Sequence, residues 1–221
     1  MDLKGIIFDM DGVIVDTEYQ DFLIQKDFIC QLNPKSNYKD SELLILVGKS
    51  YLTLYKLLQN FIGDHYDIET IEKEYAIFSD RRYKILDYRT LFRTEILEII
   101  DYSIQNGIKL AVASSSKYDH INSILETCNI KQYFDVVISG ENFVESKPNP
   151  SIYFTTLDKL NLSANQCIAI EDSYSGIEAS TNAGIPTIGY FDSRLPLFND
   201  KANWKVENMR EVLQIILSRD F

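Results

Sequence analysis

Residues 6–18 run from an apolar segment into two acids and then directly into glycine. An apolar strand of a parallel sheet is buried on both faces, and ligands of open α/β sheets bind at the carboxyl ends of such strands. Asp9 and Asp11 therefore stand where a ligand would bind. Two carboxylates this close repel each other unless a cation or a shared proton intervenes, and Mg²⁺ suits a site made of oxygen atoms. The pattern indicates a metal-assisted nucleophile; a strand that ends in two solvated acids is the alternative.

The composition is that of a globular chain with an excess of acidic residues. With 221 residues, 45% of them hydrophobic, the chain can bury a full core, as one domain with an insertion or as two modest domains. Its net charge of −11 repels phosphate backbones and anionic lipid, and no basic cluster typical of nucleic-acid binding occurs. We expect neither nucleic acid nor a membrane among its partners.

The three cysteines favour a reducing compartment. They are odd in number and show no Cys-x-x-Cys spacing, which argues against a disulfide framework and a zinc site. The first residues lack the basic region, apolar stretch and cleavage site of an export signal, and no apolar run reaches membrane-spanning length. We expect a cytoplasmic protein that is not exported, and we expect it to be a monomer.

Five apolar runs separated by helical patterns predict the fold class. Most of the runs are rich in Ile and Val, as buried parallel strands are. Apolar residues with helical spacing lie between them, and one such segment ends at Asn106-Gly107, as a helix C-terminus does. The alternation predicts an α/β fold with a doubly wound, mostly parallel sheet, a Rossmann-like core. The expected strands are Gly5–Asp9, Ile108–Ser114, Asp135–Ser139, Cys167–Glu171 and Pro186–Tyr190, and the expected helices are 94–106, 117–128 and 150–161.

Residues 18–87 differ in character from the rest of the chain. Helix-type periodicity runs through them without a convincing strand. We expect a helical cap domain here, inserted into a core made of residues 1–17 and 88–221. Its two connections would form a hinge beside the strand that ends at Asp9, where a lid can exclude water and contact a substrate.

Residues with chemical potential follow three further expected strands. The second strand ends in Ser114 and two more serines, which can hold a phosphoryl oxygen, although a serine cluster before a helix is more often an N-cap. Lys147 lies among prolines that fix the backbone and would aim the side chain; a lone surface lysine is usually solvated. The fourth strand ends in Glu171 and Asp172, which can complete an oxygen shell around Mg²⁺. Gly176 then opens the next helix, as tight loops allow.

Together these residues resemble the haloacid dehalogenase superfamily of phosphoryl-transfer enzymes. The first motif of that family appears as Asp9-Met-Asp-Gly-Val13, and the serine, lysine and paired-acid motifs follow in the family's order with ordinary spacing. The string from Phe8 to Glu18, the cap between the first and second motifs, and the string from Glu171 to Glu178 resemble the β-phosphoglucomutase-like branch. The match covers the expected core from end to end.

The resemblance implies a role for each of these residues. Asp9 would attack phosphorus and form an aspartyl phosphate, and Asp11 would protonate the leaving oxygen and then deprotonate the attacking water. Ser114 and Lys147 would neutralise the transferring group. The implied holders of Mg²⁺ are the Asp9 carboxylate, the Asp11 backbone carbonyl and Asp172, with Glu171 farther out or binding through water. The implied substrate contacts are Gly12, Ser115, Gly48 and Lys49, the last two of which fit a turn between cap helices equally well.

Several positions depart from the β-phosphoglucomutase pattern. Asp21 stands where those mutases carry a histidine, and Val47 and Tyr51 stand where they carry a lysine and an arginine. Such cations normally hold the second phosphate of a sugar bisphosphate, so we expect hydrolysis rather than mutase activity. Arg89 and Arg93 lie in the segment where relatives usually have a Pro-Gly turn. Either side chain could reach the site, but we expect both at the surface.

The sequence thus predicts a Mg²⁺-dependent phosphatase that hydrolyses a small phosphorylated metabolite, a sugar phosphate, through an aspartyl phosphate. A phosphohexomutase is the alternative within the same class of chemistry. A binding or regulatory protein that keeps the fold without turnover is the alternative from a different class. A dehalogenase is disfavoured, because a metal-free site has no need for Asp11 and the second acidic pair.

Overall fold

The computed structural model describes residues 2–49, 51–197 and 199–218, and its contacts divide the chain into two compact units. One unit is built from Met1–Asp16 and Tyr88–Phe221, and Thr17–Asp87 forms the other. Among its described residues the second unit contains helices and loops but no strand. That this unit acts as a cap over a substrate stays a prediction.

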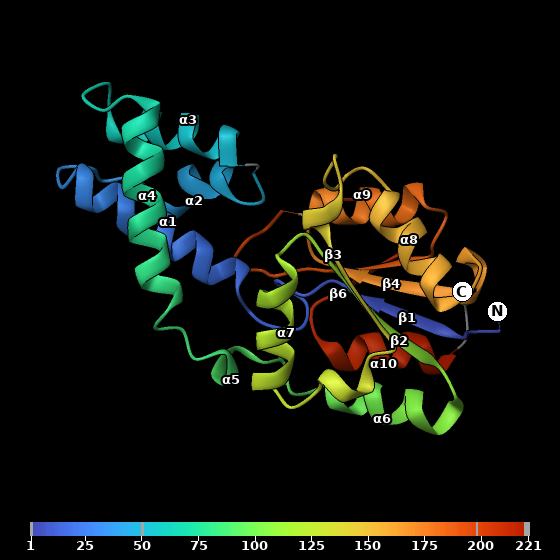
Figure 1. Ribbon diagram of the computed structural model, residues 1–221. Helices are drawn as coiled ribbons and strands as arrows, with labels where there is room; N and C mark the ends of the chain where they lie inside the picture. The colour runs from blue at the N-terminus through green and yellow to red at the C-terminus, as the bar shows by residue number, and fades with distance from the viewer. Residues whose placement is uncertain (1, 50, 198, 219–221) are drawn as a thin grey trace. The chain divides into compact units, whose positions relative to one another are not determined.

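A six-stranded parallel sheet forms the centre of the first unit (Figure 1). Its strands are β1 (Gly5–Phe8), β2 (Lys109–Ser114), β3 (Val136–Ser139), β4 (Cys167–Glu171), β5 (Thr187–Tyr190) and β6 (Trp204–Val206). They lie in the order β3-β2-β1-β4-β5-β6, which confirms the predicted doubly wound sheet. The chain order reverses at β1, and ligands of open α/β sheets bind at such a switch point.

The register of β1 explains why polar groups converge at one edge of the sheet. Phe8 pairs with Val112 of β2 and with Ile170 of β4. Asp9 follows Phe8, and its backbone N–H donates to the Ile170 carbonyl over 3.0 Å. The residues that end or follow β1, β2 and β4 therefore lie side by side.

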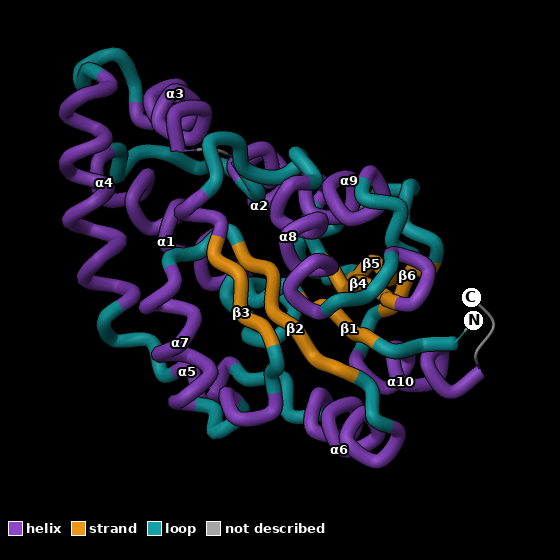
Figure 2. The backbone as a smooth tube through the Cα atoms, turned by 45° about the vertical axis from the view of Figure 1, so that its right-hand side comes forward, coloured by secondary structure: helices purple, strands orange, loops and turns teal. Residues whose placement is uncertain are grey.

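Helices cover both faces of this sheet (Figure 2). The longer ones are α6 (Ile96–Asn106), α7 (Tyr118–Thr127), α8 (Ser151–Leu160), α9 (Tyr174–Asn182) and α10 (Met209–Ser218), and the short ones are α5 (Tyr88–Leu91), η2 (Lys131–Tyr133), η3 (Gly140–Asn142) and η4 (Ala164–Gln166). Helices α6, α7 and α10 pack with Ile6 and Phe8 on one face, and α8 and α9 pack with Ile7 and Ala113 on the other. Each fully buried Ile or Phe side chain contributes roughly 1.5–3 kcal/mol, so the three layers form a stable support for the sheet edge.

Most of the predicted elements of this unit are confirmed. The five expected strands agree with β1 to β5 to within one residue at each end, and the three expected helices agree with α6, α7 and α8 to within two. Gly107 follows α6 with a φ of 65°, the left-handed conformation predicted for a helix end. Strand β6 and helix α10 are absent from the predictions.

The unit Thr17–Asp87 has a helical core of its own. Its elements are α1 (Glu18–Leu32), α2 (Asp40–Leu43), η1 (Leu44–Leu46), α3 (Tyr51–Ile62) and α4 (Ile68–Tyr83). Phe28 of α1 packs edge-on against Tyr75 of α4 with ring centroids 5.2 Å apart, and Leu58 of α3 is fully buried. Helix α4 begins after Asp67, whose side chain accepts a hydrogen bond from the Thr70 N–H.

Backbone hydrogen bonds join the two segments of the first unit that lead to and from the insertion. Val15 and Phe92 form an antiparallel bridge. The Asp16 N–H donates to the Leu91 carbonyl over 2.8 Å, and the Arg93 N–H donates to the Ile14 carbonyl over 3.1 Å. The points where the chain leaves and re-enters this unit are therefore fixed to each other.

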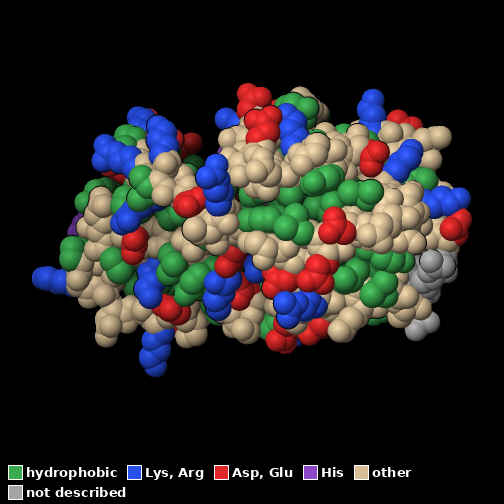
Figure 3. Space-filling view, turned by 90° about the horizontal axis from the view of Figure 1, so that it is seen from below, with side chains coloured by type: hydrophobic (Ala, Val, Ile, Leu, Met, Phe, Trp, Pro, Cys, Tyr) green, Lys and Arg blue, Asp and Glu red, His purple; other side chains and the backbone are tan. Residues whose placement is uncertain are grey.

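Basic and acidic side chains are interspersed on the face of the protein shown in Figure 3. Cys30, Cys128 and Cys167 are free thiols. None of the helices in the described part of the chain combines the length and the apolar character needed to cross a membrane.

Candidate active site

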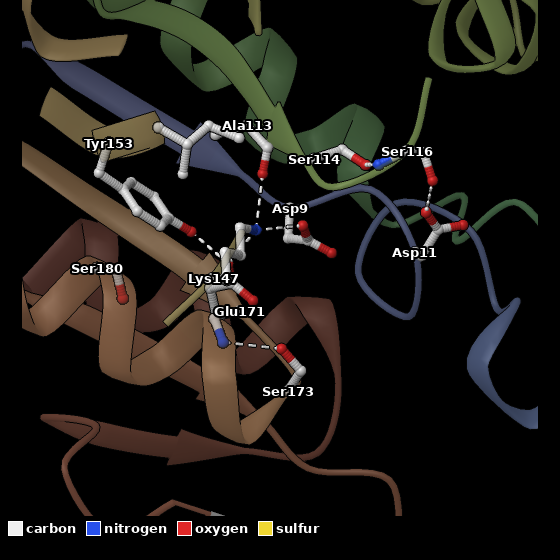
Figure 4. Close-up of polar contacts among 12 residues, drawn as sticks. Asp9, Asp11, Ala113, Ser114, Ser116, Lys147, Tyr153, Glu171, Ser173 and Ser180 are labelled. Carbon is white, nitrogen blue, oxygen red and sulfur yellow. Dashed lines mark hydrogen bonds and ion pairs between the residues drawn. The ribbon is translucent and has the colours of Figure 1, made fainter. Parts of the chain in front are cut away.

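Lys147 lies at the centre of a polar cluster at the carboxyl edge of the sheet (Figure 4). Its Nζ donates to Asp9 Oδ1 over 2.6 Å, to Glu171 Oε1 over 2.6 Å and to the Ala113 carbonyl over 2.9 Å. The side chain is 5% exposed. Because each of its three N–H groups has a partner, Lys147 is held in one direction, and the alternative of a solvated surface lysine is wrong.

Local hydrogen bonds hold the loop that carries Lys147. The Asn149 N–H donates to the Ser146 carbonyl over 3.0 Å. The Asn149 side-chain oxygen accepts from the Ser151 N–H over 2.9 Å, at the first residue of α8. This loop is therefore tied to the start of a helix that packs on the sheet, which explains how a lysine outside any strand reaches the end of β1.

Burial and neighbouring charges shift the pKa values of the central pair. Burial raises the pKa of Asp9 to about 8, because the Lys147 ammonium only partly offsets the desolvation and the charges of Glu171 and Asp11. Burial by itself lowers the pKa of Lys147, but the charges and hydrogen bonds of Asp9 and Glu171 outweigh it and raise that pKa. The lysine is therefore charged at neutral pH, and Asp9 needs further positive charge nearby to be fully ionised.

Glu171 is completely buried behind Lys147. The hydroxyl of Tyr153, on α8, donates to the same Oε1 that accepts from Lys147. Glu171 Oε2 has no hydrogen-bond partner among the described residues. It lies so close to Gly176 that a Cβ built on that glycine would come within 1.9 Å of it.

The close approach of Gly176 corrects the sequence-based explanation of this glycine. Gly176 lies in the first turn of α9 rather than in a tight loop before the helix. Its backbone conformation is helical, and what the position requires is the absence of a side chain between the helix and the Glu171 carboxylate. Packing rather than turn geometry therefore demands glycine here.

Asp11 is held by a serine that follows β2. Ser116 Oγ donates to Asp11 Oδ2 over 2.7 Å, and the Ser116 N–H donates to Ser114 Oγ over 3.1 Å. Ser114 is buried and acts as an acceptor in that bond, so its own O–H stays available as a donor. Beside them, Ser115 is exposed, and Gly12 is buried with a φ of 80°.

Asp9, Glu171 and Asp172 form a set of oxygen donors that could hold a cation. Each offers a carboxylate oxygen, and the three atoms lie within 4.8 Å of one another. With Asp11, the cluster contains four carboxylate groups and one positive charge, the ammonium of Lys147. One buried oxygen of Glu171 has no hydrogen-bond donor in the described chain. Excess negative charge and oxygen-only ligands fit a hard divalent cation such as Mg²⁺.

The structure brings most of the predicted site residues to one edge of the sheet. These are Asp9, Asp11, Gly12, Ser114, Ser115, Lys147, Glu171 and Asp172. Gly48 and Lys49 are exposed and lie in the unit Thr17–Asp87, and their contact with a substrate stays a prediction.

The structure corrects the prediction that Arg93 lies at the surface. It also adds two residues to the site, Ser116 and Tyr153, that the sequence analysis does not name. Arg89 is exposed as expected, but the side chain of Arg93 is only 15% exposed and its Nε donates to the Gly12 carbonyl. Ser116 belongs to the serine cluster after β2, so a signal for it existed. Tyr153 is a buried helix residue whose contact with Glu171 no spacing rule indicates.

Comparison with known proteins places this site in a family context. The sequence model described as haloacid dehalogenase-like hydrolase matches residues 6–190. The phosphorylated carbohydrates phosphatase of Thermotoga maritima is 27% identical over 186 residues, covering 84% of this chain and 84% of that protein. The phosphoglycolate phosphatase of Aquifex aeolicus is 27% identical over 206 residues, covering 89% and 91%. The crystal structure of β-phosphoglucomutase from Clostridium difficile shares the fold, with a TM-score of 0.76 and 23% identity over 98% of this chain and 96% of that one.

Proposed function

This chain belongs to the haloacid dehalogenase-like hydrolases, and we propose that it transfers the phosphoryl group of a sugar phosphate first to Asp9 and then to water. The position of Lys147 carries the proposal. Its Nζ lies 2.6 Å from both Asp9 and Glu171, at the strand ends where two pairs of acids meet. A fixed ammonium beside a nucleophilic carboxylate can neutralise the oxygens of a phosphoryl group, which is the main task of a phosphoryl-transfer site.

The side chains of this cluster divide the reaction between them. Asp9 attacks phosphorus and becomes an aspartyl phosphate as the bond to the leaving oxygen breaks. Asp11 gives a proton to the leaving oxygen and later takes one from the water that attacks the aspartyl phosphate. The Ser114 hydroxyl and the Lys147 ammonium bind the phosphoryl oxygens during both steps.

A divalent cation belongs to the same proposal. Asp9, Asp172 and the backbone carbonyl of Asp11 would hold Mg²⁺, which supplies positive charge to the phosphoryl oxygens when bound. Glu171 would hold Lys147 in place through the hydrogen bond from Lys147 Nζ to Glu171 Oε1. Since burial raises the pKa of Asp9 to about 8, positive charge next to it favours the ionised nucleophile at neutral pH.

Residues of the unit Thr17–Asp87 favour water over a sugar hydroxyl as the final acceptor. The Asp21 carboxylate accepts a hydrogen bond from the Tyr83 hydroxyl over 2.5 Å, and Tyr51 is exposed. Neither side chain supplies the positive charge that a second phosphate group would need. The Thermotoga maritima relative is named a phosphatase of phosphorylated carbohydrates, which supports a sugar phosphate as the substrate.

Phosphate release from a panel of sugar phosphates in the presence of Mg²⁺ tests the proposal. We expect turnover by the wild-type protein and a loss of at least about 10²–10³-fold in Asp9→Asn, the scale seen when one preorganised catalytic group is removed. Asp101→Asn is the matched control, because Asp101 is exposed on α6. Turnover by Asp9→Asn close to that of the wild type would contradict the proposal.

The same assay separates the alternatives. Glucose 1-phosphate with a catalytic amount of its bisphosphate would be isomerised without phosphate release by a mutase, and that result would contradict hydrolysis. If neither the sugar phosphates nor an aryl phosphate lose phosphate in the presence of Mg²⁺, the protein is a binding or regulatory protein instead.

A further inference from the structure

Arg93 contacts three points of the loop that follows β1. Its backbone N–H donates to the Ile14 carbonyl over 3.1 Å, and its Nε donates to the Gly12 carbonyl over 3.1 Å. Its Nη2 lies 3.3 Å from Asp16 Oδ1. The guanidinium also stacks on the ring of Tyr190 at the end of β5, with 4.4 Å between its central carbon and the ring centroid. One side chain therefore ties the β1 loop to another strand end of the sheet.

The loop that Arg93 contacts carries Asp11. The Gly12 N–H donates to the Val15 carbonyl over 2.8 Å, and the Val15 N–H donates to the Met10 carbonyl over 3.1 Å, which closes a tight turn. Met10 and Val15 are fully buried, so this turn is fixed to the core at both ends. The Gly12 carbonyl belongs to the residue next to Asp11, and the bond from Arg93 Nε limits the rotation of the backbone at that point.

Arg93 belongs to a network of ion pairs made of two arginines and two aspartates. Asp16 Oδ1 also accepts from Arg194 Nη2 over 2.6 Å, and Arg194 pairs with Asp192. The four charges balance, so the network needs no counter-charge from the phosphoryl site. The side chain of Arg93 is largely shielded from water, and a charged donor in such surroundings makes a stronger hydrogen bond than a neutral one.

We propose that Arg93 is a positioning residue for the reaction, because it fixes the β1 loop so that the Asp11 carboxylate can protonate the leaving oxygen. The inference rests on the phosphatase function proposed above. A side chain without N–H donors could not bond the Gly12 carbonyl or pair with Asp16 as Arg93 does. The contacts of Lys147 go to Asp9, Glu171 and Ala113, so loss of Arg93 should leave the nucleophile and its ammonium in place.

The proposal implies a dependence on the leaving group. A nitrophenolate leaves readily without a proton, whereas a sugar alkoxide needs one from a general acid. A residue that only positions the general acid therefore matters more for a sugar phosphate than for nitrophenyl phosphate. The ratio of kcat/KM for the two substrates isolates this effect, because kcat/KM includes departure of the leaving group but not the later attack of water.

Two substitutions of Arg93, measured with both substrates, test the inference. Arg93→Met keeps an unbranched side chain without donors, and we expect kcat/KM for the sugar phosphate to fall about 10²-fold, the usual cost of a misplaced catalytic group. For nitrophenyl phosphate we expect a fall of less than about tenfold, since proton donation contributes less there. Arg93→Lys should recover part of the loss, because it restores one donor.

A double-substitution cycle with Asp11 makes the test specific. Asp11→Asn should show the same preference for nitrophenyl phosphate. Adding Arg93→Met to Asp11→Asn should then cost little more, because both changes remove the same proton transfer. Arg194→Met, which removes the other arginine bound to Asp16, should cost less than Arg93→Met, and the exposed Arg89→Met should match the wild type.

The outcomes separate this inference from the function on which it rests. Equal losses of Arg93→Met on both substrates, or a fully additive effect with Asp11→Asn, would overturn the positioning role while the phosphatase activity stands. If Arg93→Met does not fold, the same substrate ratio for Arg93→Lys decides. A wild-type protein that releases phosphate from neither substrate would instead contradict the proposed function, and the inference with it.

Discussion

Lys147 and Glu171 are charged side chains that the fold buries almost completely, with exposed fractions of 5% and 0%. Burial of an unpaired charge costs several kcal/mol, so each of these residues depends on the other. The Tyr153 hydroxyl shares Glu171 Oε1 with Lys147. As a second donor to Glu171, Tyr153 would leave the Lys147 ammonium available to Asp9 and, in the proposed reaction, to the phosphoryl group.

Tyr153→Phe removes that donor and keeps the buried ring. We expect the protein to lose about 1–3 kcal/mol of stability, the cost of leaving a buried partner with one hydrogen bond fewer. We also expect kcat to fall roughly 10–100-fold, as when groups that orient a ligand are removed. Urea unfolding and steady-state kinetics measure the two effects. Tyr133→Phe, at an exposed position, is the control, and an unchanged kcat in Tyr153→Phe would rule out the positioning role.

The raised pKa of Asp9 predicts how the affinity for Mg²⁺ depends on pH. Between the ordinary value of 3.8 and about 8, the folded protein without a cation holds a proton on Asp9 that the unfolded chain has released. This carboxyl group therefore makes folding less favourable as the pH rises through that window. A cation that binds Asp9 displaces the proton, so the affinity for Mg²⁺ should rise up to about tenfold per pH unit and level off near pH 8.

Calorimetric titration with Mg²⁺ at several values of pH from 6 to 9 measures this dependence. The stabilisation by Mg²⁺ in thermal unfolding should grow over the same range. In Asp9→Asn the pH dependence should largely disappear, because the titrating group is gone. A Mg²⁺ affinity of the wild type that stays constant from pH 6 to 8 would show that no proton leaves Asp9.

At the scale of single residues, the sequence reveals side chains that follow strands and hides those that reach the site from elsewhere. Asp9 and Ser114 are predictable, because the carboxyl ends of parallel strands meet at one edge. Tyr153 and Arg93 act through contacts with residues 18 and 81 positions away in the chain, and such distances have no periodic signature.

Gly176 links the helix α9 to the buried carboxylate of Glu171. In most helices, replacing glycine by alanine adds up to about 1 kcal/mol of stability. Gly176→Ala should do the opposite and cost about 1–3 kcal/mol, because the new Cβ would lie 1.9 Å from Glu171 Oε2, and Lys147 and Tyr153 hold the other oxygen of that carboxylate in place.

Chemical unfolding and kinetics of Gly176→Ala check this prediction. We expect activity to fall with stability, since Glu171 must move and Lys147 with it. Ser175→Ala changes the neighbouring residue of the same helix and should be close to neutral. A Gly176→Ala protein as stable and active as the wild type would mean that α9 shifts without disturbing the carboxylate.

At the scale of elements, prediction succeeds where the hydrophobic pattern is long and regular. Strands β1 to β5 are short apolar runs between polar turns, and α6 to α8 repeat the helical period over several turns. Strand β6 spans Trp204–Val206 at the edge of the sheet, too short for a pattern to stand out. Helix α10 does carry the helical spacing, at Met209, Val212 and Ile216, and the predictions leave that signal unused.

In the whole molecule, the residues of the candidate active site and the inserted helices belong to different units. All the residues of the proposed Mg²⁺ site belong to the unit Met1–Asp16 with Tyr88–Phe221, whereas Thr17–Asp87 is held together by its own helical core. A ligand stabilises the part of a protein that binds it. Binding of Mg²⁺ without substrate should therefore act on the first unit.

Hydrogen exchange with and without Mg²⁺ tests that division. We expect slower exchange at the ends of β1 and β4 and at the start of α9, and little change in α3 and α4. Asp172→Asn should abolish the effect of Mg²⁺, while the exposed Asp101→Asn should leave it intact. Equal protection of α3 and α4 by Mg²⁺ alone would contradict the assignment of the cation to the first unit.

In the proposed reaction, Asp9 carries the phosphoryl group between substrate and water. The most direct test is to mix the protein with a sugar phosphate that carries a radioactive phosphoryl group, quench the reaction in acid within milliseconds and map the labelled peptide. We expect a label on the peptide that contains Asp9. It should be labile in alkali, as an acyl phosphate is, and absent in Asp9→Asn. Turnover of the sugar phosphate with no label on the protein, or with the label on another residue, would contradict it.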